Sequence, residues 1–87
     1  MAIKEYSLEM RGMPHRELIE YLLEIGGKQV GPVLYLFPKG EVVLSDEWTC
    51  TLGSLQVTAT QVTFRVDEED WPEIVQAFRF RFLSAGG

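Results

Sequence analysis

The chain opens with a strict alternation of apolar and polar residues in IKEYSLEMR, residues 3–11. Positions 6, 8 and 10 are apolar, whereas positions 5, 7 and 9 are polar. Successive side chains of an extended backbone point to opposite sides, so a period of two is typical of a strand with one buried face. The pattern therefore predicts a β-strand over residues 3–11.

After a Gly-Met-Pro interruption, HRELIEYLLEI in residues 15–25 has the three- and four-residue spacing of an α-helix. Its apolar face comprises Leu18, Tyr21, Leu22 and Ile25. Pro14 suits the first turn, because the N–H group that proline lacks would have no partner there. Gly26 and Gly27 suit the end, because glycine adopts the left-handed conformation that closes many helices without a steric penalty.

Four more strands are predicted, over residues 32–37, 41–45, 48–52 and 55–66. Gly53-Ser54 between the last two is a two-residue hairpin signal of type II′. In the last strand the apolar residues occupy positions 55, 57 and 59, and then 62, 64 and 66. We predict a bulge or bend near Thr60-Gln61, because an extra residue there would restore the phase.

The final segment, DEEDWPEIVQAFRFRFLSAGG, fits two structures. As a helix from Trp71, it has a capping box from Asp70 to Glu73 and leaves Phe80 exposed. Its apolar stripe then comprises Trp71, Ile74, Val75, Phe78 and Phe82. As a strand from Ala77, the three phenylalanines share a face, as in the last strand of a ubiquitin-like protein. The helix explains more of the segment, so we favour it.

The two structures give Gly86-Gly87 different roles. After a strand, Gly86 and Gly87 form a candidate carrier tail, whose terminal carboxylate an activating enzyme converts to a thiocarboxylate. After a helix, the same glycines are a cap. In that case the exposed Phe80 becomes a candidate anchor for a protein partner.

The predicted order of elements is β-α-β(4)-α. It defines an α+β fold in which a curved antiparallel sheet has two helices packed on one face. A chain of 87 residues with one continuous pattern is expected to form a single domain over residues 1–87.

Composition narrows the class of partner. The net charge of −5 argues against nucleic acid and anionic membranes, which both need clustered Lys and Arg. No apolar run approaches the roughly 18 residues of a transmembrane helix, and the start has no signal-peptide pattern. The single cysteine, Cys50, suits a reducing compartment. We therefore expect a cytoplasmic protein.

Few residues offer chemistry. His15 is the only histidine and has no companions for a metal site. Cys50 shares the face of Trp48 and Leu52, so we expect a buried, inert thiol. The acidic run at residues 67–70 is best explained as a turn and helix cap. The sequence thus predicts no catalytic residue, no metal and no cofactor.

An uncharged polar face is predicted around the last hairpin. Thr49 and Thr51 alternate with the apolar residues of one strand, and Gln56, Thr58 and Thr63 do the same in the next. Such a face is either the solvated side of a one-layer sheet or an assembly surface, since sheet edges with few charges pair readily. Thr49, Thr51 and Thr58 are therefore candidate interaction residues.

Three stretches, RGMPHRELIEYLLEIGG, TLGSLQVTATQVTFR and AFRFRFLSAGG, together resemble a small bacterial domain with no assigned reaction. That domain forms the C-terminal half of proteins related to the small sulfur-carrier subunit (MoaD) of molybdopterin synthase, and also exists as stand-alone copies. The resemblance implies a fold like that of the TATA-box-binding protein, β-α-β(4)-α, and a helical C-terminus. The chain lacks the ubiquitin-like half that carries the sulfur-accepting diglycine in two-domain relatives, and a shared fold does not imply DNA binding.

Three hypotheses follow. The first is a non-catalytic accessory domain that binds a protein partner or a second copy, in association with sulfur-carrier or molybdenum-cofactor proteins. The second is a stand-alone sulfur carrier that uses Gly86 and Gly87. The third is a small-ligand binder with a cavity between the sheet and the last helix, walled by Trp48, Trp71 and Tyr35.

Overall fold

The computed structural model describes residues 2–86, with side chains described as far as Phe82. Its elements are β1 (Ile3–Arg11), α1 (His15–Glu24), β2 (Lys28–Gln29), β3 (Leu34–Phe37), β4 (Gly40–Leu44), β5 (Trp48–Leu52), β6 (Leu55–Asp67) and α2 (Trp71–Gly86). The predicted order is confirmed, with the two-residue strand β2 added to it. β2 is too short for a periodic signal, and its pairing with β3 defines it.

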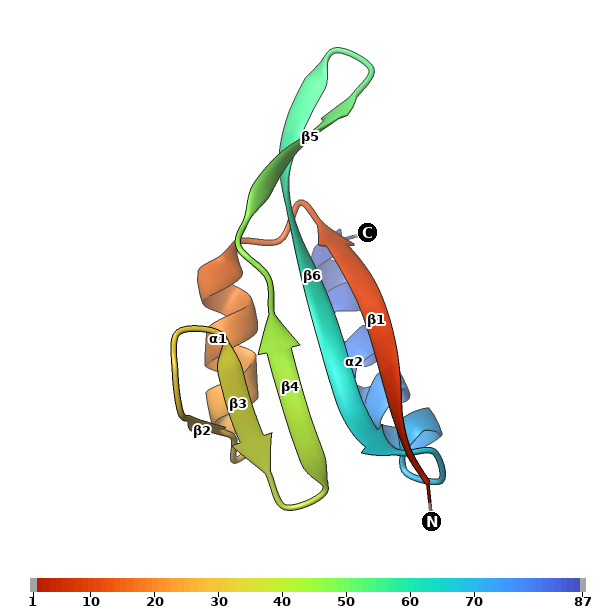
Figure 1. Ribbon diagram of the computed structural model, residues 1–87. Helices are drawn as coiled ribbons and strands as arrows, with labels where there is room; N and C mark the ends of the chain where they lie inside the picture. The colour runs from red at the N-terminus through yellow and green to blue at the C-terminus, as the bar shows by residue number, and fades with distance from the viewer. Residues whose placement is uncertain (1, 87) are drawn as a thin grey trace.

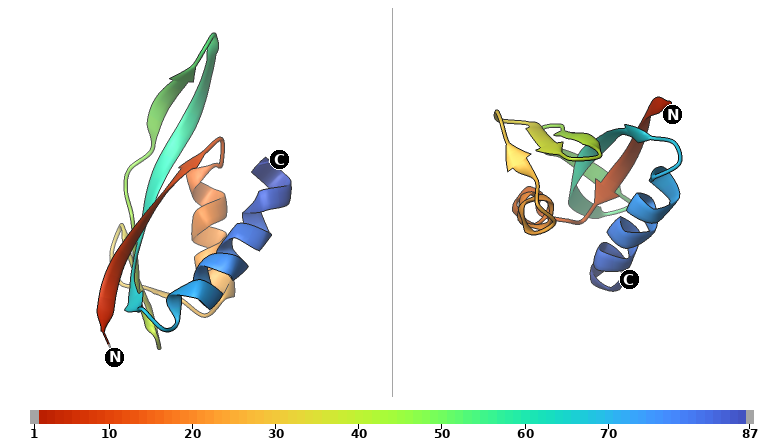
Figure 2. Two further views of the ribbon diagram at one scale, coloured as in Figure 1. Left: turned by 90° about the vertical axis from the view of Figure 1, so that its right-hand side faces the viewer. Right: turned by 90° about the horizontal axis from the view of Figure 1, so that it is seen from below.

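The strands form one antiparallel sheet in the order β1-β6-β4-β3-β2, and β5 pairs with β6. Both helices lie on the same face of this sheet, and the other face is open (Figures 1 and 2). The predicted α+β architecture, with a curved sheet and two helices on one side, is confirmed. The long strand β6 is central, because β1 pairs along one side of it and β4 and β5 along the other.

The C-terminal segment is a helix, so the strand alternative was wrong. The backbone N–H of Ile74 donates to the carbonyl oxygen of Asp70 at 3.1 Å, which places Asp70 at the N-cap position. Phe78 and Phe82 are buried, whereas Phe80 is 83% exposed. The helical stripe therefore decides which phenylalanines are buried.

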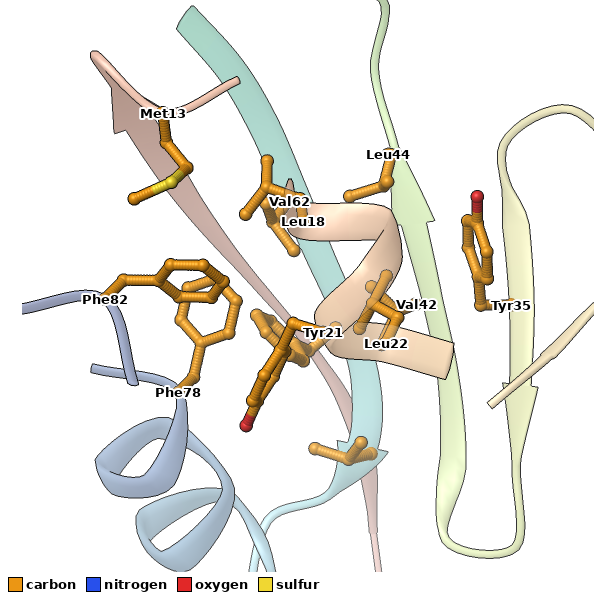
Figure 3. Packing of buried hydrophobic residues seen from close by; sticks show 12 residues of the cluster. Met13, Leu18, Tyr21, Leu22, Tyr35, Val42, Leu44, Val62, Phe78 and Phe82 are labelled. Carbon is orange, nitrogen blue, oxygen red and sulfur yellow. The ribbon is translucent and has the colours of Figure 1, made fainter. Parts of the chain in front are cut away.

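An aromatic cluster joins the two helices to the sheet (Figure 3). The ring of Phe78 lies edge-on to Phe64 of β6, with centroids 5.3 Å apart, and to Tyr21 of α1, at 5.6 Å. At the start of α2, Trp71 stacks on Tyr6 of β1 at 4.2 Å. Because these contacts link two strands of the sheet to both helices, they fix the two helices against the sheet.

Tyr35 of β3 is fully buried, and its hydroxyl has no hydrogen-bond partner among the described residues. Burial raises the pKa of Tyr35 above its usual 10.0. In the unfolded chain this phenol ionises near pH 10, while in the folded protein it keeps its proton to higher pH. Its contribution to stability is therefore complete below pH 10 and is lost as the pH rises through the folded pKa.

We expect the free energy of unfolding, measured by urea denaturation, to fall above pH 10, and Tyr35→Phe to make this fall shallower. At neutral pH the variant should be within about 1 kcal/mol of the wild type or more stable, because it removes an unpaired buried hydroxyl. An unchanged slope above pH 10 in Tyr35→Phe would count against this assignment.

The irregularity predicted near Thr60-Gln61 lies on the neighbouring strand instead, so that prediction needs correction. β6 pairs with β1 without interruption from Ala59 to Asp67. On its other side, Leu44 of β4 pairs with Val62, whereas Trp48 of β5 pairs with Ala59. Three residues, 45–47, therefore stand opposite two, 60–61. Because β6 itself continues without a bulge, its apolar residues at 55, 57 and 59 lie on the opposite face of the sheet from those at 62, 64 and 66, which face the helices.

Beyond this bulge, β5 and the first part of β6 form a two-stranded arm, residues 48–59, which projects from the body (Figure 1). Gly53 at its tip has φ +63°, and no other described residue of the turn has positive φ. This is the predicted type II′ turn, which needs positive φ only at its first central residue. The arm is thus a regular hairpin that the helices do not cover.

Candidate interaction surface

One face of the arm is apolar over its whole length. The pairs Trp48–Ala59, Cys50–Val57 and Leu52–Leu55 all lie on this side. Leu55 is 67% exposed, Leu52 44% and Trp48 39%, whereas Ala59 at the base of the arm is buried, so the outer part of the face is open to solvent. Exposed apolar side chains gathered on one projecting element are typical of an interaction site.

The sequence analysis did not identify this face, because alternation alone suggested that Trp48 and Leu52 were buried. Cys50, expected to be buried, is only half-buried. One available signal was composition, since residues 48–63 contain no Asp, Glu, Lys or Arg. A solvated hairpin is ordinarily marked by charges, so a neutral stretch of this length indicates contact with another surface.

The opposite face of the arm carries the predicted threonines. Thr49 pairs with Thr58, and Thr51 pairs with Gln56, so the structure brings the three candidate threonines together. All three are exposed. Phe80 lies elsewhere, on the outward side of α2, and is not part of this surface.

Charged residues occupy the open face of the body, in contrast to the arm. Arg65 of β6 donates to Glu5 of β1 at 3.0 Å and to Glu41 of β4 at 3.2 Å. The hydrogen bond to Glu5, followed by the charges of Glu5 and Glu41, raises the pKa of Arg65. At the base of the arm, Arg11 pairs with Glu9, and this bond raises the pKa of Arg11. The ion pairs thus end where the apolar face begins.

A cavity of about 270 Å³ opens between the end of α1, the turn from β3 to β4, and the start of α2. Its lining is mostly apolar, with Lys39 as the one charged residue, and it includes Ile25, Phe37, Phe64 and Ile74. It lies between the sheet and the last helix, as the small-ligand hypothesis required. None of the three expected walls lines it: Trp48 is in the arm, Trp71 stacks on Tyr6, and Tyr35 lies in the core.

The other candidate groups have structural surroundings. His15 lies at the start of α1, where its Nε2 is 3.2 Å from the carbonyl oxygen of Ser45. The carboxylate of Asp67 accepts from the backbone N–H of Glu69 at 2.9 Å and shapes the turn before α2. Within residues 2–86, no three His, Cys, Asp or Glu side chains lie close enough to share a metal ion.

The predicted carrier tail is described only in part. Gly86 is the last residue of α2. Gly87 lies outside the described residues, so its role stays a prediction. In the described part of the chain, no helix is both long and apolar enough to cross a membrane.

These features define a class: a small α+β domain whose open antiparallel sheet carries two helices on one face and extends into an apolar β-arm. Residues 6–87 match the model of the archaeal MoaD-like protein family, and the chain therefore belongs to that family. A search of curated proteins found no match. The family match supports the relation to MoaD inferred from the sequence, while the bacterial origin and the place of the domain in longer relatives stay predictions.

Proposed function

We propose that this protein is a non-catalytic interaction domain that binds protein partners through its arm, in association with sulfur-carrier or molybdenum-cofactor proteins. The observation that carries the proposal is the exposed apolar face of the arm, centred on Leu52 and Leu55. The family match supports the association. Protein is the partner class favoured by a neutral, partly aromatic surface on an acidic chain.

The helical C-terminus favours this role over that of a sulfur carrier. A carrier must extend its last residues into the narrow channel of an activating enzyme. In this chain the helical backbone continues to Gly86. A carrier role would require that helix to unwind first, which adds a free-energy cost that an extended tail does not have.

The test uses two matched variants of the arm, Leu55→Lys on the apolar face and Gln56→Lys on the opposite face. Both positions are exposed and adjacent in β6, and each variant changes the net charge equally. Binding to a purified sulfur-carrier protein of the molybdenum-cofactor type would be measured by titration calorimetry. We expect Leu55→Lys to weaken binding at least about tenfold, and Gln56→Lys to change it by less than about threefold. Equal effects of the two variants, or no binding by the wild type, would contradict the proposal.

A further inference from the structure

The outer edge of β5 has no neighbouring strand. Among residues 2–86, β5 pairs with β6 alone. The strand on that side of the sheet is β3, which begins at Leu34, opposite Val43 of β4. Next to this pair, the Leu44 amide donates to the Val33 carbonyl at 2.9 Å. β5 therefore stands clear of β3 in Figure 1. Natural proteins ordinarily protect such edges with charges or proline, and the sequence of β5, WTCTL, contains neither.

The backbone groups that face this edge belong to Thr49 and Thr51. The carbonyl of Thr58 accepts from the Gly12 amide at 2.7 Å, on the β1 side, so it points away from β5. Its partner Thr49 is therefore in a non-hydrogen-bonded pair and directs its own N–H and C=O outward. Thr51, two residues on, does the same, whereas Cys50 between them bonds inward to β6.

We propose that a second copy of this chain binds this edge, with the two β5 strands antiparallel about a twofold axis at Cys50. The proposal rests on the proposed function, because it adds a second copy, at the edge of β5, to the protein partners that the arm binds. In this register Thr49 faces Thr51 of the second copy, and the two residues exchange both backbone hydrogen bonds. The twofold axis generates the same two hydrogen bonds between Thr51 and Thr49 of the second copy. Both copies therefore use the same surface, and the pairing is closed and isologous.

Charge directs the binding of a second copy to the arm. Each chain has a net charge of −5, so two copies repel each other over most of their surfaces. The arm is the part of the chain where contact forms without opposing like charges, because residues 48–63 contain no charged side chain. A partner recognised through its charge would need counter-charges that the arm does not provide.

The side chains also match in this register. On the apolar face Trp48 lies beside Leu52 of the second copy, and on the other face threonines meet across the axis. Aromatic–aliphatic and Thr–Thr pairs are both favourable across strands. The two arms become a four-stranded sheet, and this matters because an isolated two-stranded ribbon is at best marginally stable in water.

Cys50 provides a direct readout of the register. The two Cys50 residues form a non-hydrogen-bonded pair, whose Cα atoms lie about 4.5 Å apart, within the span of a disulfide. Diamide takes up two hydrogens as two thiols join, so it should link the two copies through their single cysteines. Non-reducing electrophoresis and peptide mass spectrometry would detect the link. Sedimentation of the reduced protein would measure the dimer itself.

The test compares two double variants that place the same charges on the same face of the arm. Thr49→Lys with Thr51→Lys puts like charges directly opposite each other across the proposed axis. Gln56→Lys with Thr58→Lys puts them one strand further away, on β6. We expect the first pair to raise the dimer dissociation constant at least about tenfold and to lower the cross-linking yield accordingly, and the second to change either by less than about threefold.

Three results would overturn the proposal: a wild-type protein that stays monomeric at about 1 mM, a dimer that diamide does not link through Cys50, or equal effects of the two double variants. None of them overturns the proposed function, because a monomer can still lose binding to a sulfur-carrier protein on Leu55→Lys. Conversely, a wild-type protein that dimerises through Cys50 but does not bind the sulfur-carrier protein would contradict the proposed function and support the dimer.

Discussion

Replacement of Phe78 by alanine is expected to lower the free energy of unfolding by about 3–5 kcal/mol. The side chain is 1% exposed, and its ring centroid lies 4.9–5.6 Å from those of Phe82, Phe64 and Tyr21. Its removal leaves a cavity between both helices and β6, and close-packed neighbours relax only partially into such a space. A small domain has about 5–15 kcal/mol of stability, so the loss is a large share.

The matched control is Phe80→Ala, in the same helix and two residues away. Phe80 is 83% exposed, so we expect a change within about 0.5 kcal/mol. Thermal denaturation would separate the two variants clearly, since 1 kcal/mol corresponds to roughly 4–8 °C for a domain of this size. Similar large losses at both positions would mean that α2 does not present the stripe that buries Phe78.

Gly40→Ala is expected to destabilise the protein by about 3 kcal/mol or more, because it combines backbone strain with a steric clash. Gly40 begins β4 opposite Val66, with φ +155°. A Cβ at this position would lie 2.3 Å from the carbonyl oxygen of Arg65 and 2.8 Å from Cγ1 of Val66. The backbone of β6 is held on both sides by β1 and β4, so it cannot move away without breaking pairs.

Gly31→Ala is the control for this substitution. A Cβ at Gly31 would meet no atom within 4 Å, and its φ is not in the left-handed region. We expect a change within about 0.5 kcal/mol in the free energy of unfolding. Urea denaturation would measure this value for both Gly40→Ala and Gly31→Ala. If Gly40→Ala were as mild as Gly31→Ala, β4 would not approach β6 as closely as described.

Most of the fold could be predicted from the sequence. The alternation in residues 3–11 predicted β1, and the spacing of Leu18, Tyr21 and Leu22 predicted α1. The hairpin turn at Gly53 was predicted with its type. These signals are local, since they arise from the period of the element and from the conformations that glycine and proline allow. β2 could not be predicted, because its two residues are a strand only through their pairing with β3.

The candidate site could be predicted only in part. Thr49, Thr51 and Thr58 were identified as a face, and the structure brings them together. The exposure of Leu52 and Leu55 was missed, because an alternating strand looks the same whether its apolar face is covered or open. The cavity wall formed by Phe37 and Phe64 was missed for a related reason, since its lining residues come from segments that are distant in sequence.

The sequence by itself determined the two helices, every strand except β2 and the order of these elements, and it determined that residues 48–63 would carry no charge. Only the tertiary structure decided which apolar faces are covered. α1 and α2 pack over the inner half of β6, where Val62 and Phe64 are buried, and they do not cover the arm (Figure 2). Burial depends on where neighbouring elements end in space. The apolar residues in the inner half of β6 face the helices and form the core, whereas those in the arm lie on the opposite face, which the helices do not cover, and form an open interaction surface.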